Sequence, residues 1–457
     1  MAAPSLPSLL LLSSLLLLLA ASPPPSASAA ASRGSFLKLP LLHRPSRTPQ
    51  LLRRGRSRSA ASPVTSAAPF GAGQYLVALH LGTPPQRLLL VADTGSDLVW
   101  ARCSACRGAG CSRRAPGSAF LARRSSSFRP HHCYSASCRL VPRPSPPPRC
   151  NRTRLHSACR YEYTYSDGSL SSGFFARETV SLHTTSAKTK AAAARLKGLA
   201  FGCGFRVSGP SVTGSSFNGS QGVMGLGRGP ISFASQLGRR FGSNKFSYCL
   251  KDYTLLPSPT SYLIIGDRPS ADNAAAASPL AFTPLLANPL APSFYYVGIK
   301  RVSVDGERLP IDPSVWSLDD LGNGGTILDS GTTLTFLAEP GYRPLLAAMR
   351  RRVGLPAAAA AAPGFDLCVN VTGAGRRPRL PRLSFEMEGG AVLAPPAGNY
   401  FIDVAKGVRC LAVRPAGAAA EGGGFSVIGN VMQQGFLWEF DVDRSRLGFS
   451  RRGCAAS

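Results

Sequence analysis

Two short segments of the chain repeat one arrangement of aspartate, hydroxyl residue and glycine. Each aspartate ends an apolar, strand-like run, and each loop leads back into another such run. The repeated residues are Asp93, Thr94, Gly95 and Ser96 in the first segment, and Asp329, Ser330, Gly331 and Thr332 in the second. An apolar-apolar-Gly segment follows each copy, at 222–225 and 426–429. The repeat predicts two related lobes that each contribute one loop to a shared site.

Two carboxyl groups that meet at one site can activate water. One keeps its proton while the other ionises, because two adjacent negative charges repel each other. The ionised group can take a proton from a water that attacks a peptide carbonyl, while the protonated group donates to the carbonyl oxygen. We therefore interpret Asp93 and Asp329 as a catalytic pair that titrates as a unit.

The neighbours of the two aspartates suit this chemistry. The glycine in each loop allows a sharp turn and the close approach of a substrate backbone. Ser96 and Thr332 can donate hydrogen bonds to the carboxylate oxygens, and Thr94 and Ser330 can link the two loops. A single Asp-hydroxyl-Gly triplet is an ordinary turn, but two copies in matching strand contexts indicate a catalytic pair.

The segments that must position these loops are mostly strand-like. Short runs of β-branched and aromatic residues, closed by turn residues, occur at 74–81, 87–92 and 294–304. Helical patterns are few and include 231–237 and 342–353. We expect a mostly-β fold with two pseudo-twofold-related lobes and a central cleft.

The chain has 457 residues, which is too long for one small domain. We expect a signal peptide at 1–29, a basic pro-segment or linker at 30–68, an N-terminal lobe at 69–266 with a disulfide-rich insertion at 103–159, and a C-terminal lobe at 267–457. The segment 30–68 is rich in Pro, Ser and Arg and has little apolar periodicity. We therefore expect ordered structure to begin near Gly71 and the segment before it to contribute no core.

The first residues predict export. Leu6–Ala21 is an uncharged, Leu-rich run followed by small residues, as in a cleaved signal peptide, and it is short for a membrane span. A transit peptide is the alternative, since the next stretch is rich in Ser and Arg and lacks acids. No later run is long enough to span a bilayer. We expect a soluble monomer secreted to the apoplast or cell wall, with the vacuole, another endomembrane compartment or the chloroplast as alternatives.

The chain has 12 cysteines, an even number that suggests disulfides in a secreted protein. Cys103 and Cys106 alone could suggest zinc or redox chemistry, but no second tight Cys or His pair lies nearby, and we expect no metal or cofactor. Cys454 begins a formal prenylation box, but prenylation is cytosolic and Cys454 makes the cysteine count even. Three triplets fit N-glycosylation: those at Asn151, Asn218 and Asn370.

The formal net charge is +29. Such a charge favours contact with polyanions and does not define a fold. The arginines are dispersed, and no aromatic-interleaved basic motif or nucleic-acid module is present. We expect no specific nucleic-acid partner, and weak association with a polyanion such as a cell-wall polymer stays open.

These features resemble the pepsin-like aspartic proteases, and more closely their plant nepenthesin-like branch. Gly82–Gln86 precedes the first aspartate as in that family, and segments at 201–204, 246–250 and 366–368 also match. The resemblance covers nearly all of 71–454. It implies an aspartic endopeptidase that acts on peptides or proteins at acid pH.

The segment Tyr165–Ser169 resembles the flap of this family, which closes over bound peptide. The resemblance implies that Tyr165 is the flap tyrosine and forms a hydrogen bond with Trp100. The other implied flap residues are Asp167, Gly168 and Ser169. The family usually has Gly where this chain has Ser166.

The cysteine-rich block at 103–159 resembles the insertion that marks the nepenthesin-like branch. The resemblance implies the pairs Cys103–Cys106, Cys111–Cys203, Cys133–Cys159, Cys138–Cys150, Cys249–Cys454 and Cys368–Cys410. Spacing alone does not define this connectivity.

Two further hypotheses concern storage as an inactive zymogen and a role as an inactive binding protein. The cationic segment 30–68 would be attracted to ionised carboxylates in the cleft near neutral pH and released in acid, as in an inactive zymogen. The rival to an enzyme is an inactive binding protein, since plant xylanase inhibitors resemble this fold without the complete aspartate pair. Both aspartates stand in intact motifs here, which favours the enzyme.

Overall fold

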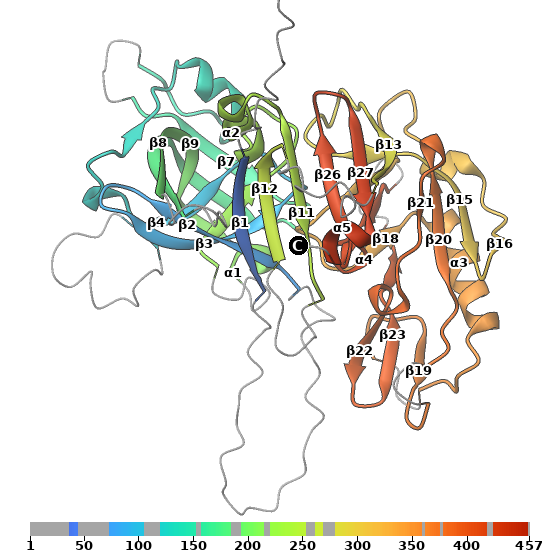
Figure 1. Cartoon of the computed structure of the whole chain (residues 1–457). Coiled ribbons are helices and arrows are strands. Elements are labelled where there is room, and N and C mark those ends of the chain that lie inside the picture. Colours follow the sequence, from blue (N-terminus) through green and yellow to red (C-terminus); the bar gives the residue numbers. More distant parts are fainter. Residues whose placement is uncertain are drawn as a thin grey trace, which may run out of the picture. The chain divides into compact units, whose positions relative to one another are not determined.

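The computed structural model describes most of the chain beyond residue 72 and one short segment before it. The described residues are 36–43, 73–104, 119–151, 157–183, 193–213, 220–252, 261–267, 279–358, 362–374, 378–417 and 424–455. They all belong to one compact unit, residues 34–457. Strands predominate in this unit, so the prediction of a mostly-β fold is confirmed (Figure 1).

The N-terminal part is built from long, paired strands and two short helices. The strands are β1 (Phe36–His43), β2 (Tyr75–Leu81), β3 (Gln86–Asp93), β4 (Trp100–Ser104), β5 (Phe120–Leu121), β6 (Arg129–Pro130), β7 (Arg160–Thr164), β8 (Leu170–His183), β9 (Ala193–Ser208), β10 (Gly222–Gly225), β11 (Lys245–Cys249) and β12 (Ser261–Gly266). The helices are α1 (Pro210–Thr213) and α2 (Phe233–Phe241), the second of which corresponds to the helical pattern at 231–237.

The C-terminal part has shorter strands and the longest helix. Its strands are β13 (Ala281–Leu286), β14 (Tyr296–Val297), β15 (Ile299–Val304), β16 (Glu307–Arg308), β17 (Thr326–Leu328), β18 (Thr335–Leu337), β19 (Cys368–Asn370), β20 (Leu383–Met387), β21 (Val392–Leu393), β22 (Phe401–Ala405), β23 (Val408–Leu411), β24 (Val413–Pro415), β25 (Ser426–Ile428), β26 (Leu437–Asp441) and β27 (Arg446–Ser450). Its helices are α3 (Glu339–Arg352), α4 (Asn430–Gln433) and α5 (Arg451–Ala455).

The same strand arrangement surrounds each aspartate loop. Strand β3 pairs in parallel with β10, and β10 also pairs antiparallel with β4. In the second lobe, β17 pairs in parallel with β25, which also pairs antiparallel with β18. A glycine at a crowded point supports each arrangement: a Cβ on Gly222 would lie 2.0 Å from the carbonyl oxygen of Trp100, and one on Gly429 would lie 2.1 Å from that of Leu334. The sequence repeat is therefore a repeat of structure, as a bilobal fold requires.

One antiparallel sheet joins the two lobes. Its pairings run from β1 to β12, β11, β26, β27 and β13. At the seam between β11 and β26, Phe246 stacks on Phe440 with ring centroids 4.5 Å apart. The disulfide between Cys249 and Cys454 lies at the far end of β11. The relative position of the lobes is thus fixed by backbone, aromatic and covalent contacts.

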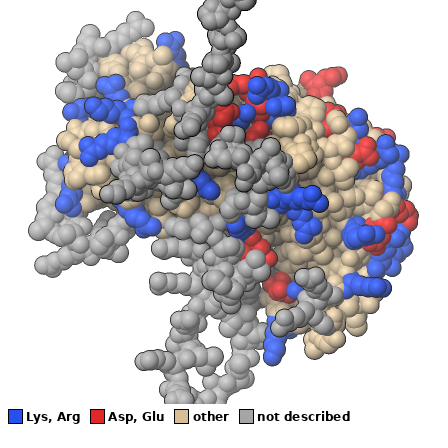
Figure 2. Space-filling view, in the orientation of Figure 1, with Lys and Arg blue, Asp and Glu red and all other residues tan. Residues whose placement is uncertain are grey.

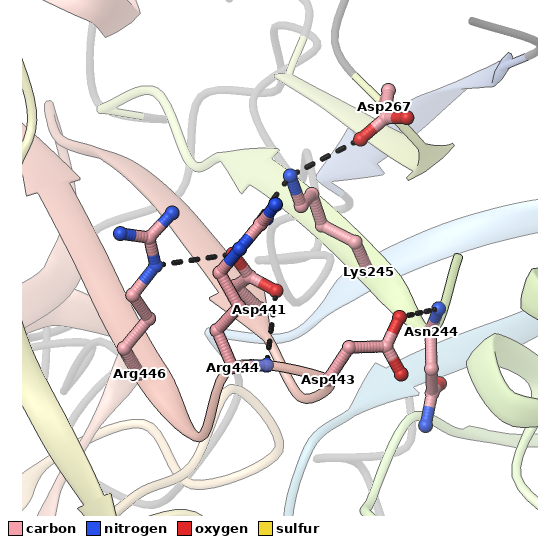
Figure 3. Close-up of polar contacts among 7 residues, drawn as sticks. All are labelled: Asn244, Lys245, Asp267, Asp441, Asp443, Arg444 and Arg446. Carbon is pink, nitrogen blue, oxygen red and sulfur yellow. Dashed lines mark hydrogen bonds and ion pairs between the residues drawn. The ribbon is translucent and has the colours of Figure 1, made fainter. Parts of the chain in front are cut away.

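An ion cluster lies at the other end of this seam (Figure 3). The Asp441 side chain is 1% exposed and accepts from Arg444 and Arg446, each at 3.1 Å. Lys245, on the other lobe's strand, lies 3.9 Å from Asp441 and 3.1 Å from Asp267. Burial alone would raise the pKa of Asp441, but the hydrogen bonds from the two arginines and the charge of Lys245 outweigh burial and lower it.

The expectation for the segment before Gly71 is wrong for residues 36–43. These form β1, which pairs with both β12 and β2. Its alternate residues Leu37, Leu39 and Leu41 are each at most 2% exposed and belong to the main core. Composition averaged over 30–68 hides this short alternating run, although its period of two is that of a half-buried strand. The remainder of 30–68, and the signal peptide expected at 1–29, lie outside the described residues.

The cysteine pairing of the insertion differs from the one that the resemblance implies. The structure has Cys103–Cys203, Cys133–Cys150 and Cys138–Cys159 in place of Cys103–Cys106, Cys111–Cys203, Cys133–Cys159 and Cys138–Cys150. Cys106 and Cys111 lie outside the described residues. The bonds Cys249–Cys454 and Cys368–Cys410 are present as implied.

Strand pairing and burial explain the difference. Strand β4 runs parallel to β9 with Ala101 opposite Cys203, which brings Cys103 within 5.3 Å of Cys203 between Cα atoms. Cys138 and Cys159 are both buried in one apolar cluster and bond to each other. Cys133 and Cys150 are both half-buried. Pairing therefore follows depth in the fold, which sequence spacing does not report.

Candidate active site

The two aspartate loops hold their carboxyl groups in the same way. Asp93 accepts from the backbone N–H of Gly95 at 2.9 Å and from the Ser96 hydroxyl. Asp329 accepts from the backbone N–H of Gly331 at 2.8 Å and from Thr332 Oγ1 at 2.5 Å. Each carboxyl is thus fixed by one amide and one hydroxyl of its own loop.

Reciprocal hydrogen bonds tie the loops together below the carboxyls. The Thr94 N–H donates to Ser330 Oγ at 3.1 Å, and the Ser330 N–H donates to Thr94 Oγ1 at 2.9 Å. Each hydroxyl then donates across to the strand of the other loop, Thr94 to the Leu328 carbonyl and Ser330 to the Ala92 carbonyl. Both side chains are at most 1% exposed. A buried, satisfied network of this kind rigidifies the geometry of the pair.

Each loop's glycine faces the carboxyl of the other loop. A Cβ on Gly95 would lie 2.8 Å from Asp329 Oδ1, and a Cβ on Gly331 would lie 2.3 Å from Asp93 Oδ1. Neither φ is in the left-handed region, so the requirement for glycine here is space and not backbone conformation. Any side chain at these positions would push the two carboxyls apart.

Burial and mutual repulsion disfavour a second negative charge at the pair. The pKa of Asp93 is raised well above its ordinary value, first by burial and then by the charge of Asp329. Hydrogen bonds from Ser96 and Gly95 offset only part of this. The pair therefore retains a proton at pH values where a free aspartate is ionised.

The hairpin from β7 to β8 lines the same cleft as the two carboxyls. Tyr165 follows β7, and its hydroxyl accepts from Trp100 Nε1 at 2.7 Å. Burial, and then the charge of Asp93, raises the pKa of Tyr165, so this hydroxyl stays protonated. The hydrogen bond between Tyr165 and Trp100 that the resemblance implies is therefore present.

The hairpin tip is a tight turn closed by its own polar groups. Gly168 has φ +76°, which favours glycine. The Ser169 N–H donates to Asp167 Oδ1 at 2.9 Å, and the Ser169 hydroxyl donates to Oδ2 at 2.8 Å. Burial acts to raise the pKa of Asp167, but the bonds from Ser211 and Ser169 outweigh it and lower the pKa. Asp167 thus acts in the described chain as an acceptor that shapes the turn.

A cleft of about 460 Å³ lies at the pair and is lined from both lobes. Val91, Tyr163 and Val223 contribute apolar surface from the first lobe. The second lobe contributes mainly apolar and aromatic side chains: Phe294, Ile327, Phe336, Phe425 and Val427. The carboxyls are among the few charged groups in this lining, so the cleft suits an extended chain with apolar side chains.

Sequence reasoning missed a link between the two lobes beside the aspartate loops. Asp97 Oδ2 accepts from Ser293 Oγ at 2.5 Å, and Asp97 Oδ1 accepts from the Gly229 N–H at 2.8 Å. Burial raises the pKa of Asp97, and the bonds from Ser293 and Gly229 oppose the rise. Two residues beyond Ser293, the Tyr295 carbonyl accepts from the Leu328 N–H, directly before Asp329. A charged residue inside an apolar run was the one signal available in the sequence.

Two buried amide side chains after β25 were also missed. Asn430 Nδ2 donates to the Ser330 carbonyl at 3.1 Å, and Gln433 Nε2 donates to the Asp329 carbonyl at 3.2 Å. Both residues are fully buried. They hold the backbone of the second loop, as buried amides must do to satisfy their own donors.

Other predicted sites lie on the surface or outside the description. Asn151 and Asn370 are exposed, as glycosylation requires, and Asn218 lies outside the described residues. Within the described part of the chain, no group of three or more His, Cys, Asp or Glu is placed to hold a metal ion. None of the helices in that part is long and apolar enough to cross a membrane.

Together, the duplicated fold, the linked aspartate loops and the β7–β8 hairpin at the cleft define a pepsin-like aspartic protease architecture. Comparison with known families agrees: residues 75–267 match the model described as Xylanase inhibitor N-terminal, and residues 294–451 match Xylanase inhibitor C-terminal. The chain belongs to the nepenthesin-like family of plant aspartic proteases.

Curated relatives and solved structures support this membership. Aspartyl protease family protein 2 of Arabidopsis thaliana is 37% identical over 86% of this chain and 74% of its own length. Aspartic proteinase nepenthesin-1 of Nepenthes gracilis is 34% identical over 87% of this chain and 82% of its own length. The crystal structures of edgp (22% identical, TM-score 0.68, covering 92% and 95% of the two chains) and of Basic 7S globulin from soybean (20%, 0.64, 91% and 96%) share the fold.

Proposed function

We propose that the chain is a secreted aspartic endopeptidase that hydrolyses peptide bonds at acid pH through Asp93 and Asp329. The single observation that supports this best is the reciprocal bonding of the two loops, which holds two carboxyls together in a buried site. Such a pair shares a proton, and this half-protonated state is the one that can act as acid and base at once.

In the proposed mechanism, the ionised carboxyl takes a proton from a water held between the two groups. The water oxygen attacks the peptide carbonyl carbon, and the protonated carboxyl donates to the carbonyl oxygen, giving a neutral tetrahedral diol. Its collapse breaks the C–N bond, a proton passes to the leaving nitrogen, and the pair returns to its starting protonation. The fixed hydrogen bonds from Ser96 and Thr332 orient the carboxyls throughout.

The substrate would lie extended in the cleft beneath the flap. Tyr165 and the hairpin tip would cover it and exclude water from the carboxyls, which strengthens electrostatic interactions there. Apolar lining on both sides of the pair favours bulky apolar side chains flanking the scissile bond.

An inactive binding protein is the alternative function, because the two matching family models are named for xylanase inhibitors. The loop geometry favours the enzyme, because both carboxyls, both supporting hydroxyls and both glycines are in place. A pure binding protein would have no need for a buried pair of acids whose repulsion raises a pKa.

Export, glycosylation at Asn151, Asn218 and Asn370, and zymogen storage are parts of the same proposal. For the zymogen, the purified chain from residue 30 should cleave a peptide only after acid treatment and processing. Equal rates before and after acid, without processing, would remove this part.

Weak polyanion association is also proposed, without a dedicated nucleic-acid surface. On the face seen in Figure 2, Lys and Arg lie in separate clusters among other residues. A dispersed charge of this kind gives salt-dependent, non-specific binding. Retention on immobilised pectin that does not change with salt would contradict it.

A pH-rate profile with a peptide library tests the proposed function. We expect cleavage with an acid optimum, inhibited by pepstatin, between apolar residues. The outcome that would overturn it is the absence of pepstatin-sensitive cleavage at any acid pH after processing.

A further inference from the structure

A second groove lies along strands β7, β8 and β9, away from the hairpin tip at 165–169. It has a volume of about 580 Å³ and is lined by β7, β8, β9 and the segment 144–148. Pro144, Pro146 and Pro148 form one part of its lining, the proline wall, and residues of the three strands form the rest, its floor. The groove contains neither aspartate of the pair and shares no lining residue with the cleft.

The floor of the groove is aromatic. Phe174 and Phe205 meet edge to face, with ring centroids 5.6 Å apart and planes at 73°. Phe205 is 42% exposed, so part of its ring is in contact with water. Covering it with an apolar ligand group would remove this surface from water.

Two arginines flank the aromatic floor. Arg160 lies opposite Phe174 across the strands, with its guanidinium 5.1 Å from the ring centroid. Arg206 lies opposite Ser172 on the next strand. Both are exposed, and neither forms an ion pair with another residue that the structure describes. Their donors are therefore available to an incoming carboxylate, which guanidinium binds with two hydrogen bonds.

The other charges near the groove leave it positive. The lining contains one acidic residue, Glu162, and two basic residues, Arg160 and Arg206. Arg143 and Arg149 flank the proline wall and are exposed. A ligand that matches this lining carries carboxylates beside an apolar side chain.

We propose that this groove is an exosite that binds an acidic-apolar peptide segment of a protein substrate. A peptide fits better than an acidic sugar chain because the proline wall and the Phe pair offer apolar surface and few acceptors for hydroxyl groups. The proposal rests on the proposed peptidase function and adds a substrate class to it.

The position of the groove gives the exosite a role in cleavage. Arg160 begins β7, and Tyr165 directly follows the end of that strand. The two residues are five positions apart, a distance of about 17 Å in an extended chain. A substrate held in the groove by one segment could place a second segment in the cleft through a short linker. Binding at both places raises the effective concentration of the scissile bond, so the exosite lowers KM for acidic substrates.

Direct binding to the full chain tests the exosite. The probe is a fluorescent peptide with a Glu-Leu-Glu core flanked by Gly and Ser, titrated by anisotropy at about pH 6, where glutamates are ionised. We expect Arg160→Gln with Arg206→Gln to weaken binding by about tenfold or more, as does replacing both Glu by Gln in the peptide. Phe205→Ser should weaken it by about threefold or more. The matched control is Arg87→Gln, which removes an exposed arginine outside the groove and should leave binding unchanged.

Three results would overturn the exosite. The first is equal affinity of the wild type and the double arginine variant, and the second is an equal loss of affinity with Arg87→Gln. The third is that the chain does not bind the peptide but binds an oligogalacturonate through the groove, which would assign the groove to a sugar. Cleavage of a short apolar peptide without the acidic core, measured beside this, reports on the proposed peptidase function independently of the groove.

Discussion

At the scale of single residues, the two carboxyls face opposing demands. Their own loops stabilise negative charge through an amide and a hydroxyl each, while burial and proximity oppose it. The direction of the Asp93 pKa shows that burial and repulsion prevail. The site therefore costs stability when both groups are forced to ionise.

This cost predicts a pH-dependent effect of Asp93→Asn on stability. A raised native pKa means that the native state binds the proton more tightly than the unfolded chain does. The resulting stability is fully present below the unfolded pKa, about 4, and is lost as pH rises through the native pKa. The variant lacks this ionisation, so its melting temperature relative to wild type should rise between about pH 4 and pH 7. A constant difference across that range would contradict the raised pKa.

Asp97 should act as a positioning residue, because it joins the first aspartate loop to Ser293. We expect Asp97→Asn and Ser293→Ala each to lower kcat by roughly tenfold with a smaller change in KM, since the link orients the pair and does not contact substrate. The double variant should lose little more than either single one, because both remove one link. Additive losses, or an effect on KM alone, would show that the two residues act separately.

At the scale of elements, β1 has the largest unexpected role. It pairs with both β12 and β2 in the sheet that joins the lobes, and it buries three leucines. Its removal would expose β12 and part of the core. Proteolytic processing that removes residues 36–43 should therefore lower the stability of the sheet.

Leu39→Ala tests this role. Leu39 is 2% exposed, so truncation should lower the free energy of unfolding by about 2–4 kcal/mol. Leu140→Ala serves as the control, because Leu140 is 48% exposed and should cost under about 0.5 kcal/mol. Urea unfolding of the full chain measures both. Equal small effects would mean that β1 does not pack on the sheet.

The ion cluster at the seam is suited to acid conditions. The lowered pKa of Asp441 contributes stability that is present above the unfolded pKa, about 4, and is lost as pH falls through the lower native pKa. Asp441→Asn should therefore cost about 2 kcal/mol at pH 5 and at pH 7 alike, and less below about pH 4. Asp320→Asn, which changes an exposed aspartate, is the control. If Asp441→Asn destabilised the protein at pH 7 but not at pH 5, the result would contradict the lowered pKa of Asp441.

At the scale of the whole molecule, the sequence predicts what is local and repeated. The Asp93 and Asp329 motifs are recognisable because one short pattern occurs twice. The strands and helix α3 are recognisable from the period of their apolar residues. The mostly-β, bilobal fold followed from them because each motif needs its own strands.

Features that depend on distant pairing could not be predicted. The Cys103–Cys203 bond follows from the parallel register of β4 and β9, with a sequence separation of 100. The role of Asp97 depends on Ser293, 196 residues away. The groove along β7, β8 and β9 combines these three strands with a proline segment, and its residues share no motif. All three features depend on contacts between segments that are far apart in the sequence, and tertiary packing determines those contacts.

The central claim is that Asp93 and Asp329 act together as the catalytic pair. The most direct measurement is kcat/KM on one peptide, at the acid optimum, for the wild type, Asp93→Asn, Asp329→Asn and the surface control Asp320→Asn. Both site variants should lose at least about 10³-fold while the control retains full activity, since each carboxyl performs a proton transfer that the other cannot replace. Peptidase activity that survives both site substitutions would contradict the assignment.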